Sequence, residues 1–179
     1  MILEVMGRDA GHIALATGIA GGADVILLPE IPYTIEKIAE KINAVKKRGR
    51  NFALMVVSEA VKTAEGEPYM ITHTDGQKRY GGIGTYISEE ISKATGFEAR
   101  VTVLGHVQRG SMPSYSDRLL ATAFGVKAVE MIEEGKFDRM VAWKNREVVD
   151  VSIEKAIAAY QAVDPSDTLV KTARGIGIS

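Results

Sequence analysis

Short runs of apolar residues alternate along this chain with longer stretches in which apolar residues recur at helical spacing. This alternation is typical of βαβ units, in which helices connect neighbouring strands of a mostly parallel sheet. Strands are predicted at residues 2–5, 25–28, 52–57, 100–104, 140–143 and 148–151. Helices are predicted at residues 10–19, 35–45, 81–95 and 116–134, with further helix starts at Ser152 and Asp164. We therefore expect an α/β fold of three layers, in which helices flank a mainly parallel sheet.

The helix predicted after Thr34 has the clearest pattern. Its apolar residues recur at i, i+3, i+4, i+7 and i+10, in Ile35, Ile38, Ala39, Ile42 and Val45. Thr34 is suited to cap its first turn, and Gly49 is suited to end it. The basic residues within 46–50 would then lie at the negative end of the helix dipole.

The segment from residue 60 to residue 79 interrupts this alternation. It is polar, and Gly66, Pro68 and Gly76 break any regular period. We therefore expect a surface excursion here, with a hairpin around Tyr69–His73.

Composition narrows the class of protein. The chain has 179 residues, of which 46% are apolar and 25% are charged, and these values are typical of a globular protein. A formal charge of −1 argues against extensive binding to nucleic acid or to an anionic membrane. The sequence has no cysteine, which excludes disulfides and thiolate metal sites and favours a reducing, cytoplasmic setting. The apolar runs are too short to span a membrane, and the first residues lack a secretory pattern.

Several residues suited to anion binding follow the predicted strands. Glu59, His106 and Arg109 each lie just past an apolar strand run, and a parallel sheet would bring them to one edge. Arg8 and Arg100 are the other arginines near these positions. A guanidinium can donate two parallel hydrogen bonds to phosphate or carboxylate oxygens. By spacing alone, His106 is equally well explained as a satisfied loop histidine. Any one arginine is more often a solvated surface charge. Glu59 is harder to explain in this way, because a carboxylate that ends a buried strand needs a partner or a ligand.

Other candidate motifs favour structural explanations. No strand leads directly into Gly81–Gly84, so a glycine-rich helix start is favoured over a dinucleotide fingerprint. His12 and His73 are isolated, so we expect no metal site. The basic run 46–50 is typical of a solvated helix end, with an anion site as the alternative.

Four ordered blocks of residues carry a family resemblance: Met6–Gly11, Gly21–Asp24, Val57–Glu59 and Thr102–Gly110. In this order they resemble the carboxyl-terminal half of a bacterial-type 6-phosphofructokinase, from about residue 2 to about residue 150. The Leu-Gly-His-Val-Gln-Arg-Gly block at 104–110 is the most specific. The resemblance implies a fold of the second-domain type of this family. It also implies a glycolytic kinase, a transferase that moves phosphoryl from ATP or pyrophosphate, with Mg²⁺, to the 1-hydroxyl of fructose 6-phosphate.

The resemblance also implies a substrate site. Its residues would be Met6, Gly7, Arg8, Glu59, Arg100, His106 and Arg109. The turn at 6–8 would lie against the sugar phosphate, and Glu59 would accept hydrogen bonds from sugar hydroxyls. Arg100, His106 and Arg109 would bind the 6-phosphate. Arg100 would reach this site from a neighbouring subunit, so the resemblance implies a homo-oligomer, a dimer or a tetramer.

A second, allosteric site is implied less firmly. Asp24, Arg48 and Arg50 match positions that form part of a nucleotide effector site in regulated bacterial members.

The excursion before Arg100 is longer than in the compact bacterial enzymes and resembles a subset with both ATP-dependent and pyrophosphate-dependent members. Either donor is therefore consistent with the sequence.

The catalytic parts of the family are not matched. Its glycine-rich phosphate loop, its Mg²⁺-holding aspartate and its catalytic aspartate lie in the amino-terminal half, and nothing in this sequence resembles them. Phosphoryl transfer needs positioning, charge neutralisation by metal and a base near the attacking hydroxyl. We therefore expect no catalytic residue, metal or cofactor in this chain, and no activity from the chain alone. The alternative function is a non-catalytic sugar-phosphate-binding or assembly module that acts with a partner chain.

The resemblance implies three regions. Residues 1–109 would form the α/β domain that binds the sugar phosphate. Residues 110–150, a long helix and a strand pair, would complete the missing amino-terminal half, and residues 151–179 would form a helical tail.

Overall fold

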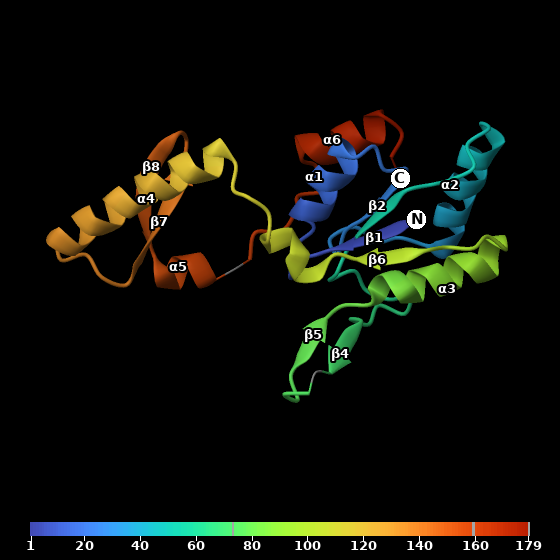
Figure 1. The fold of residues 1–179 in the computed structure, drawn as a ribbon, viewed down its shortest axis with the longest axis horizontal. Coiled ribbons are helices and arrows are strands. Elements are labelled where there is room, and N and C mark those ends of the chain that lie inside the picture. The colour runs from blue at the N-terminus through green and yellow to red at the C-terminus, as the bar shows by residue number, and fades with distance from the viewer. Residues whose placement is uncertain (73, 159, 179) are drawn as a thin grey trace. The chain divides into compact units, whose positions relative to one another are not determined.

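The computed structural model describes residues 1–72, 74–158 and 160–178. The chain forms two compact units, Met1–Arg109 with Gln161–Ser179 and Gly110–Tyr160. We call these the first unit and the second unit, and describe each by itself (Figure 1).

The first unit is built on a parallel sheet of four strands. They are β1 (Ile2–Val5), β2 (Val25–Leu27), β3 (Met55–Ser58) and β6 (Val101–Val103), in the order β2-β3-β1-β6. In the central pair, Val5 lies opposite Ser58, so β1 and β3 end at the same level. The predicted parallel sheet is confirmed.

Helices cover both faces of this sheet (Figure 1). One face packs against α2 (Ile35–Lys47) and α3 (Ile83–Thr95), and the other packs against α1 (His12–Ala20) and α6 (Thr168–Gly175). Successive side chains of a strand point to opposite faces, and Val57 accordingly joins the first core cluster while Val56 joins the second. The expected three-layer α/β fold is therefore confirmed.

The carboxyl-terminal tail does not form a separate region. Its short helix α5 (Ile153–Ile157) belongs to the second unit, whereas α6 packs on the first. The first unit includes the chain again from Gln161. Val163, the first buried residue of this last segment, donates its N–H to Glu30 Oε1 at 2.8 Å. The last helix also begins later than predicted. Asp164 only forms a turn with Ser166, and Asp167 caps α6.

The excursion contains the expected hairpin. Strand β4 (Met70–Thr72) pairs antiparallel with β5 (Lys78–Tyr80), and Tyr80 lies opposite Met70. His73, which the prediction placed in this hairpin, lies outside the described residues.

The second unit consists of a long helix, a hairpin and α5. Helix α4 (Tyr115–Glu133) begins with a capping box between Ser114 and Asp117, whose hydrogen bonds lower the pKa of the Asp117 carboxyl. Strands β7 (Arg139–Lys144) and β8 (Glu147–Ser152) pair antiparallel. They are joined by a turn at residues 145–146, both with positive φ. No helix among the described residues is long and apolar enough to cross a membrane.

Glu4 joins the central strand to α3. Its side chain is only 1% exposed, and its two oxygens accept from the N–H groups of Gly82 and Gly84, each at 2.8 Å. These N–H groups belong to the first turn of α3, which has no other side-chain cap. The buried carboxylate therefore satisfies two backbone donors and lies at the positive end of the helix dipole.

We expect Glu4→Gln to lower the free energy of unfolding by on the order of 2 kcal/mol, because the amide would turn an NH₂ group toward one of the two donors. Urea unfolding measures this loss. The control is Glu36→Gln, an exposed change in the first turn of α2, which should cost less than about 0.5 kcal/mol. Equal losses for both variants would contradict the capping role.

Candidate functional site

The carboxyl edge of the sheet gathers most of the candidate residues. The turn Met6–Arg8 follows β1, Glu59 follows β3, and a 3₁₀ helix, η1 (Gly105–Arg109), follows β6. Because β1 lies between β3 and β6, this turn lies between Glu59 and η1. Three segments far apart in the sequence thus meet at the edge where open α/β sheets bind ligands.

Glu59 holds the turn that follows β1. Its Oε1 accepts from the N–H groups of Gly7, at 3.1 Å, and Arg8, at 2.8 Å. Its Oε2 makes no hydrogen bond to any other described residue. The carboxylate therefore has a structural partner on one oxygen, while the other can accept from a ligand.

The geometry of the turn explains its residues. A Cβ on Gly7 would lie 2.5 Å from the carbonyl oxygen of Ala10, so a larger residue would displace the backbone. Arg8 has a φ of 53°, in the left-handed region that non-glycine residues rarely adopt. The Arg8 side chain is 91% exposed, with Nε 3.8 Å from Asp9 Oδ2. The turn therefore directs the guanidinium into solvent.

Gln108 makes a contact that the sequence pattern did not predict. Its Oε1 accepts from the N–H of Met6 at 2.8 Å and so joins η1 to the turn. The available signal was its place between His106 and Arg109 in the most specific block, but spacing assigned it no role.

His106 and Arg109 are exposed basic side chains on η1. Neither side chain makes a hydrogen bond or an ion pair with any of the described residues. Both are therefore available to an anion that approaches this edge.

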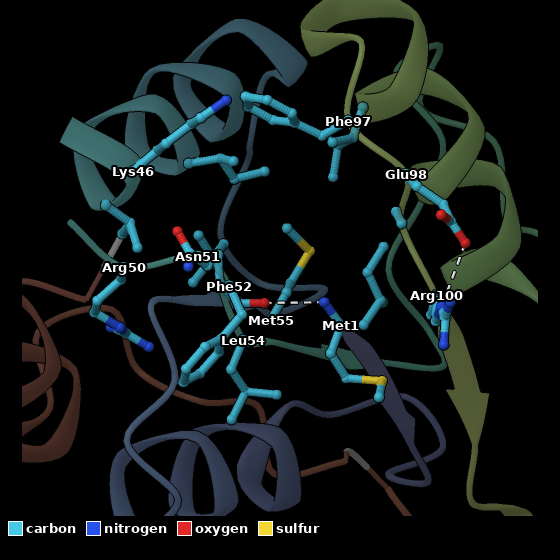
Figure 2. Close-up of a pocket in the computed structure, with 17 residues that line it drawn as sticks. Met1, Lys46, Arg50, Asn51, Phe52, Leu54, Met55, Phe97, Glu98 and Arg100 are labelled. Carbon is cyan, nitrogen blue, oxygen red and sulfur yellow. Dashed lines mark hydrogen bonds and ion pairs between the residues drawn. The ribbon is translucent and has the colours of Figure 1, made fainter. Parts of the chain in front are cut away.

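Arg100 lies elsewhere. It precedes β6, whereas η1 follows it, so Arg100 is at the amino edge and the structure does not bring it to the other candidates. It lines a largely apolar pocket of about 370 Å³ and forms an ion pair with Glu98 at 3.3 Å (Figure 2). At the rim of this pocket, Lys46 stacks on the ring of Phe97 at 4.1 Å (Figure 2).

The three candidate effector residues lie together. Asp24 is almost fully buried and accepts from Arg50 at 2.6 Å and from the N–H of Leu54 at 2.9 Å. With Arg48, Lys41 and residues 176–178, they line a pocket of about 280 Å³. Arg50 is therefore partly neutralised by Asp24, which leaves Arg48 as the unpaired arginine of this pocket within the described chain.

The described residues offer no site for a metal ion. Across residues 1–72, 74–158 and 160–178, no group of three or more His, Asp or Glu side chains is arranged to hold one. His12 instead pairs its Nε2 with the carbonyl oxygen of Gln161 at 2.8 Å. The described residues therefore do not fit Mg²⁺.

Comparison with known proteins agrees with this fold. A family model described as phosphofructokinase matches residues 1–132. That span is most of the chain, and the chain belongs to the phosphofructokinase family.

Two relatives are "ATP-dependent 6-phosphofructokinase 1" of a Nostoc species, 61% identical over 178 residues, and the protein of the same description from a Synechocystis species, 60% identical. Each alignment covers 99% of this chain but 50% and 49% of the relative, so the chain spans about half the length of these relatives. Among solved structures, the pyrophosphate-dependent phosphofructokinase of Nitrosospira multiformis superposes with a TM-score of 0.70 at 26% identity. That match covers 91% of this chain and 41% of the other.

We expect Glu59→Ala to lower the free energy of unfolding by about 1 to 3 kcal/mol, because the N–H groups of Gly7 and Arg8 lose their acceptor. Glu59→Gln retains an acceptor oxygen and should cost less than about 1 kcal/mol. Urea unfolding compares the two variants. If Glu59→Gln destabilises the chain as much as Glu59→Ala, the charge rather than the acceptor holds the turn.

Proposed function

We propose that this chain binds fructose 6-phosphate and supplies the sugar-phosphate half of a 6-phosphofructokinase. The observation that carries the proposal is the meeting of the Met6–Arg8 turn, Glu59 and η1 at one edge of the sheet. The site would combine an arginine and a histidine that have no partner among the described residues with a carboxylate that has a free oxygen. Such a site suits a ligand with a phosphate at one end and hydroxyls at the other.

Each residue would have a defined task. His106 and Arg109 would bind the 6-phosphate, and Arg8 would add its guanidinium from the turn. Glu59 would accept from a sugar hydroxyl through Oε2 while Oε1 keeps the turn in place. Met6 and Gly7 would line the sugar through their backbone, because a side chain on Gly7 has no room.

We propose ATP as the phosphoryl donor of the whole enzyme. The relatives at 61% and 60% identity are described as ATP-dependent, whereas the pyrophosphate-dependent structure is only 26% identical. The described residues provide neither a ligand set for Mg²⁺ nor a match to the catalytic aspartate, so the chain alone would not turn over. A glycolytic enzyme of this kind would act in the cytoplasm.

Arg100 would act on a second copy of the chain. It is 79% exposed at the amino edge, away from the residues that would bind the sugar phosphate of its own chain. An exposed arginine at that edge can reach the site of a neighbouring copy, which supports a homo-oligomer. The pocket around Asp24, Arg48 and Arg50 would bind an anionic effector, with Arg48 as its main cation.

The second unit would pack against the amino-terminal half of the enzyme. Its helix α4 exposes Leu119 at 66%, Val126 at 57% and Ile132 at 61%, with Met131 as its one buried residue among those described. Exposed apolar surface of this kind commonly marks a partner surface.

The substrate site is tested by titration with fructose 6-phosphate. We expect Arg109→Ala and His106→Ala each to weaken binding roughly tenfold to a hundredfold, because each removes a charge-assisted contact worth about 1.5 to 3 kcal/mol. Isothermal calorimetry measures the affinity. Arg174→Ala, which removes the same charge as Arg109→Ala at an exposed site on α6, is the control and should leave affinity unchanged. Unchanged affinity in either test variant would place the site elsewhere.

The partner surface is tested by sedimentation. We expect the isolated chain to self-associate through α4 and to show no phosphofructokinase activity in a coupled assay. Mixing with the amino-terminal half of a close relative should reduce self-association and yield activity.

The test variant is Val126→Glu, which should reduce self-association, and the control is Leu169→Glu, an exposed apolar position on α6. A monomer at all concentrations, with α4 amides exchanging as slowly as those of β1 and β3, would mean that the second unit needs no partner. Turnover by the chain alone would contradict the division of the enzyme proposed here.

A further inference from the structure

We propose that Tyr80, on the β4–β5 hairpin, is a positioning residue for the sugar-phosphate site. Its hydroxyl would hold Asp9 in place, and Asp9 would orient the guanidinium of Arg8. The proposal rests on the proposed function, because it assigns a role to Tyr80 in the same site. It also explains why a surface hairpin is joined to the turn after β1.

The link is a direct contact between segments 71 residues apart. The Tyr80 hydroxyl donates to Asp9 Oδ1 at 3.1 Å, in a partly buried position. The other oxygen of the same carboxylate, Oδ2, lies 3.8 Å from Arg8 Nε. The carboxylate of Asp9 therefore contacts Tyr80 of the hairpin and also lies beside Arg8, which would bind the phosphate.

Arg8 needs such a neighbour because little else restrains its side chain. The N–H of Arg8 is held by Glu59, but the side chain is 91% exposed and has many rotamers. A ligand that uses a free arginine must first order it, which weakens binding. A carboxylate beside the guanidinium reduces that cost only if the carboxylate is itself fixed. The Tyr80 hydroxyl would fix it.

The base of the hairpin is suited to this task. It leads into α3, from which it projects in Figure 1, and the first turn of α3 is held by the buried carboxylate of Glu4 through Gly82 and Gly84. A Cβ on Gly82 would lie 3.2 Å from the ring of Tyr69, so the ring packs closely on the backbone there. Tyr80 is thus two residues from a segment anchored to the central strand.

The tip of the hairpin is also restrained. Asp75 accepts from Arg79 at 2.7 Å and from the N–H of Gln77 at 2.9 Å, and Gly76 has a positive φ of 77°. These contacts favour one conformation of the β5 strand that carries Tyr80.

The test compares two variants that each lose one hydroxyl. Tyr80→Phe removes the donor to Asp9, whereas Tyr69→Phe removes a hydroxyl that has no hydrogen bond to any described residue. We expect the dissociation constant for fructose 6-phosphate to rise about 3- to 10-fold in Tyr80→Phe and to stay unchanged in Tyr69→Phe. In an Arg8→Ala background, Tyr80→Phe should have no further effect, because the residue it positions is gone. A purely structural role would give the same loss in both backgrounds.

A second measurement needs no ligand. Hydrogen exchange at the amides of Gly7 and Arg8 should be several-fold faster in Tyr80→Phe than in Tyr69→Phe, while β1 and β3 amides are unchanged. If the unaltered chain binds fructose 6-phosphate and Arg109→Ala weakens binding, but Tyr80→Phe does not, the role of Tyr80 is overturned. If the unaltered chain does not bind, the proposed function fails instead, and faster exchange in Tyr80→Phe would still assign Tyr80 to the turn.

Discussion

The parallel pairing of β1 with β3 decides where the candidate ligands of the sugar phosphate lie. Because Val5 is opposite Ser58, the chain leaves both strands at one level, and Glu59 is adjacent to the turn that follows β1. A shift of one residue in this register would turn the strands' side chains to the wrong faces of the sheet and remove Glu59 from the N–H groups of Gly7 and Arg8. Register in the core is therefore what holds Arg8 in its left-handed backbone conformation at the surface.

Carboxylates and cations have different uses in the first unit. The carboxylates near strand ends accept from backbone N–H groups of other segments, as Glu4, Asp24, Glu30 and Glu59 all do. Each such contact fixes a loop against the sheet and satisfies a donor that would otherwise lack a partner. The cations of the carboxyl edge are instead exposed, and the side chains of His106 and Arg109 have no partner among the described residues. Side-chain contacts thus hold the backbone at this edge, while the basic side chains there remain accessible to an anion.

The sequence predicted the layers and the edge that Glu59, His106 and Arg109 share, because apolar runs locate strands and the residues just after parallel strands share an edge. It could not predict contacts in which one side chain binds the backbone of a distant segment. In the sequence, Glu4 is only a polar residue within a strand, and its role depends on the N–H of Gly82, 78 residues away. In the same way, Gln108 is only a polar residue after a strand, and its role depends on the N–H of Met6. Asp164 and Asp167 are equally good helix caps by composition, and only the packing of Val170 and Ala173 selects the second. Arg100 directly precedes β6 and therefore lies at the opposite edge of the sheet, so the carboxyl-edge site of its own copy of the chain cannot include it.

The proposed function requires the carboxyl edge of the first unit to bind the phosphorylated sugar. Titration of the ¹⁵N-labelled chain with fructose 6-phosphate, followed by amide chemical shifts, tests this binding directly. We predict shifts at Gly7, Arg8, Glu59 and residues 105–109, with much smaller shifts when fructose replaces the phosphate ester. Shifts confined to residues 41–50 and 176–178, or equal shifts with fructose, would contradict it.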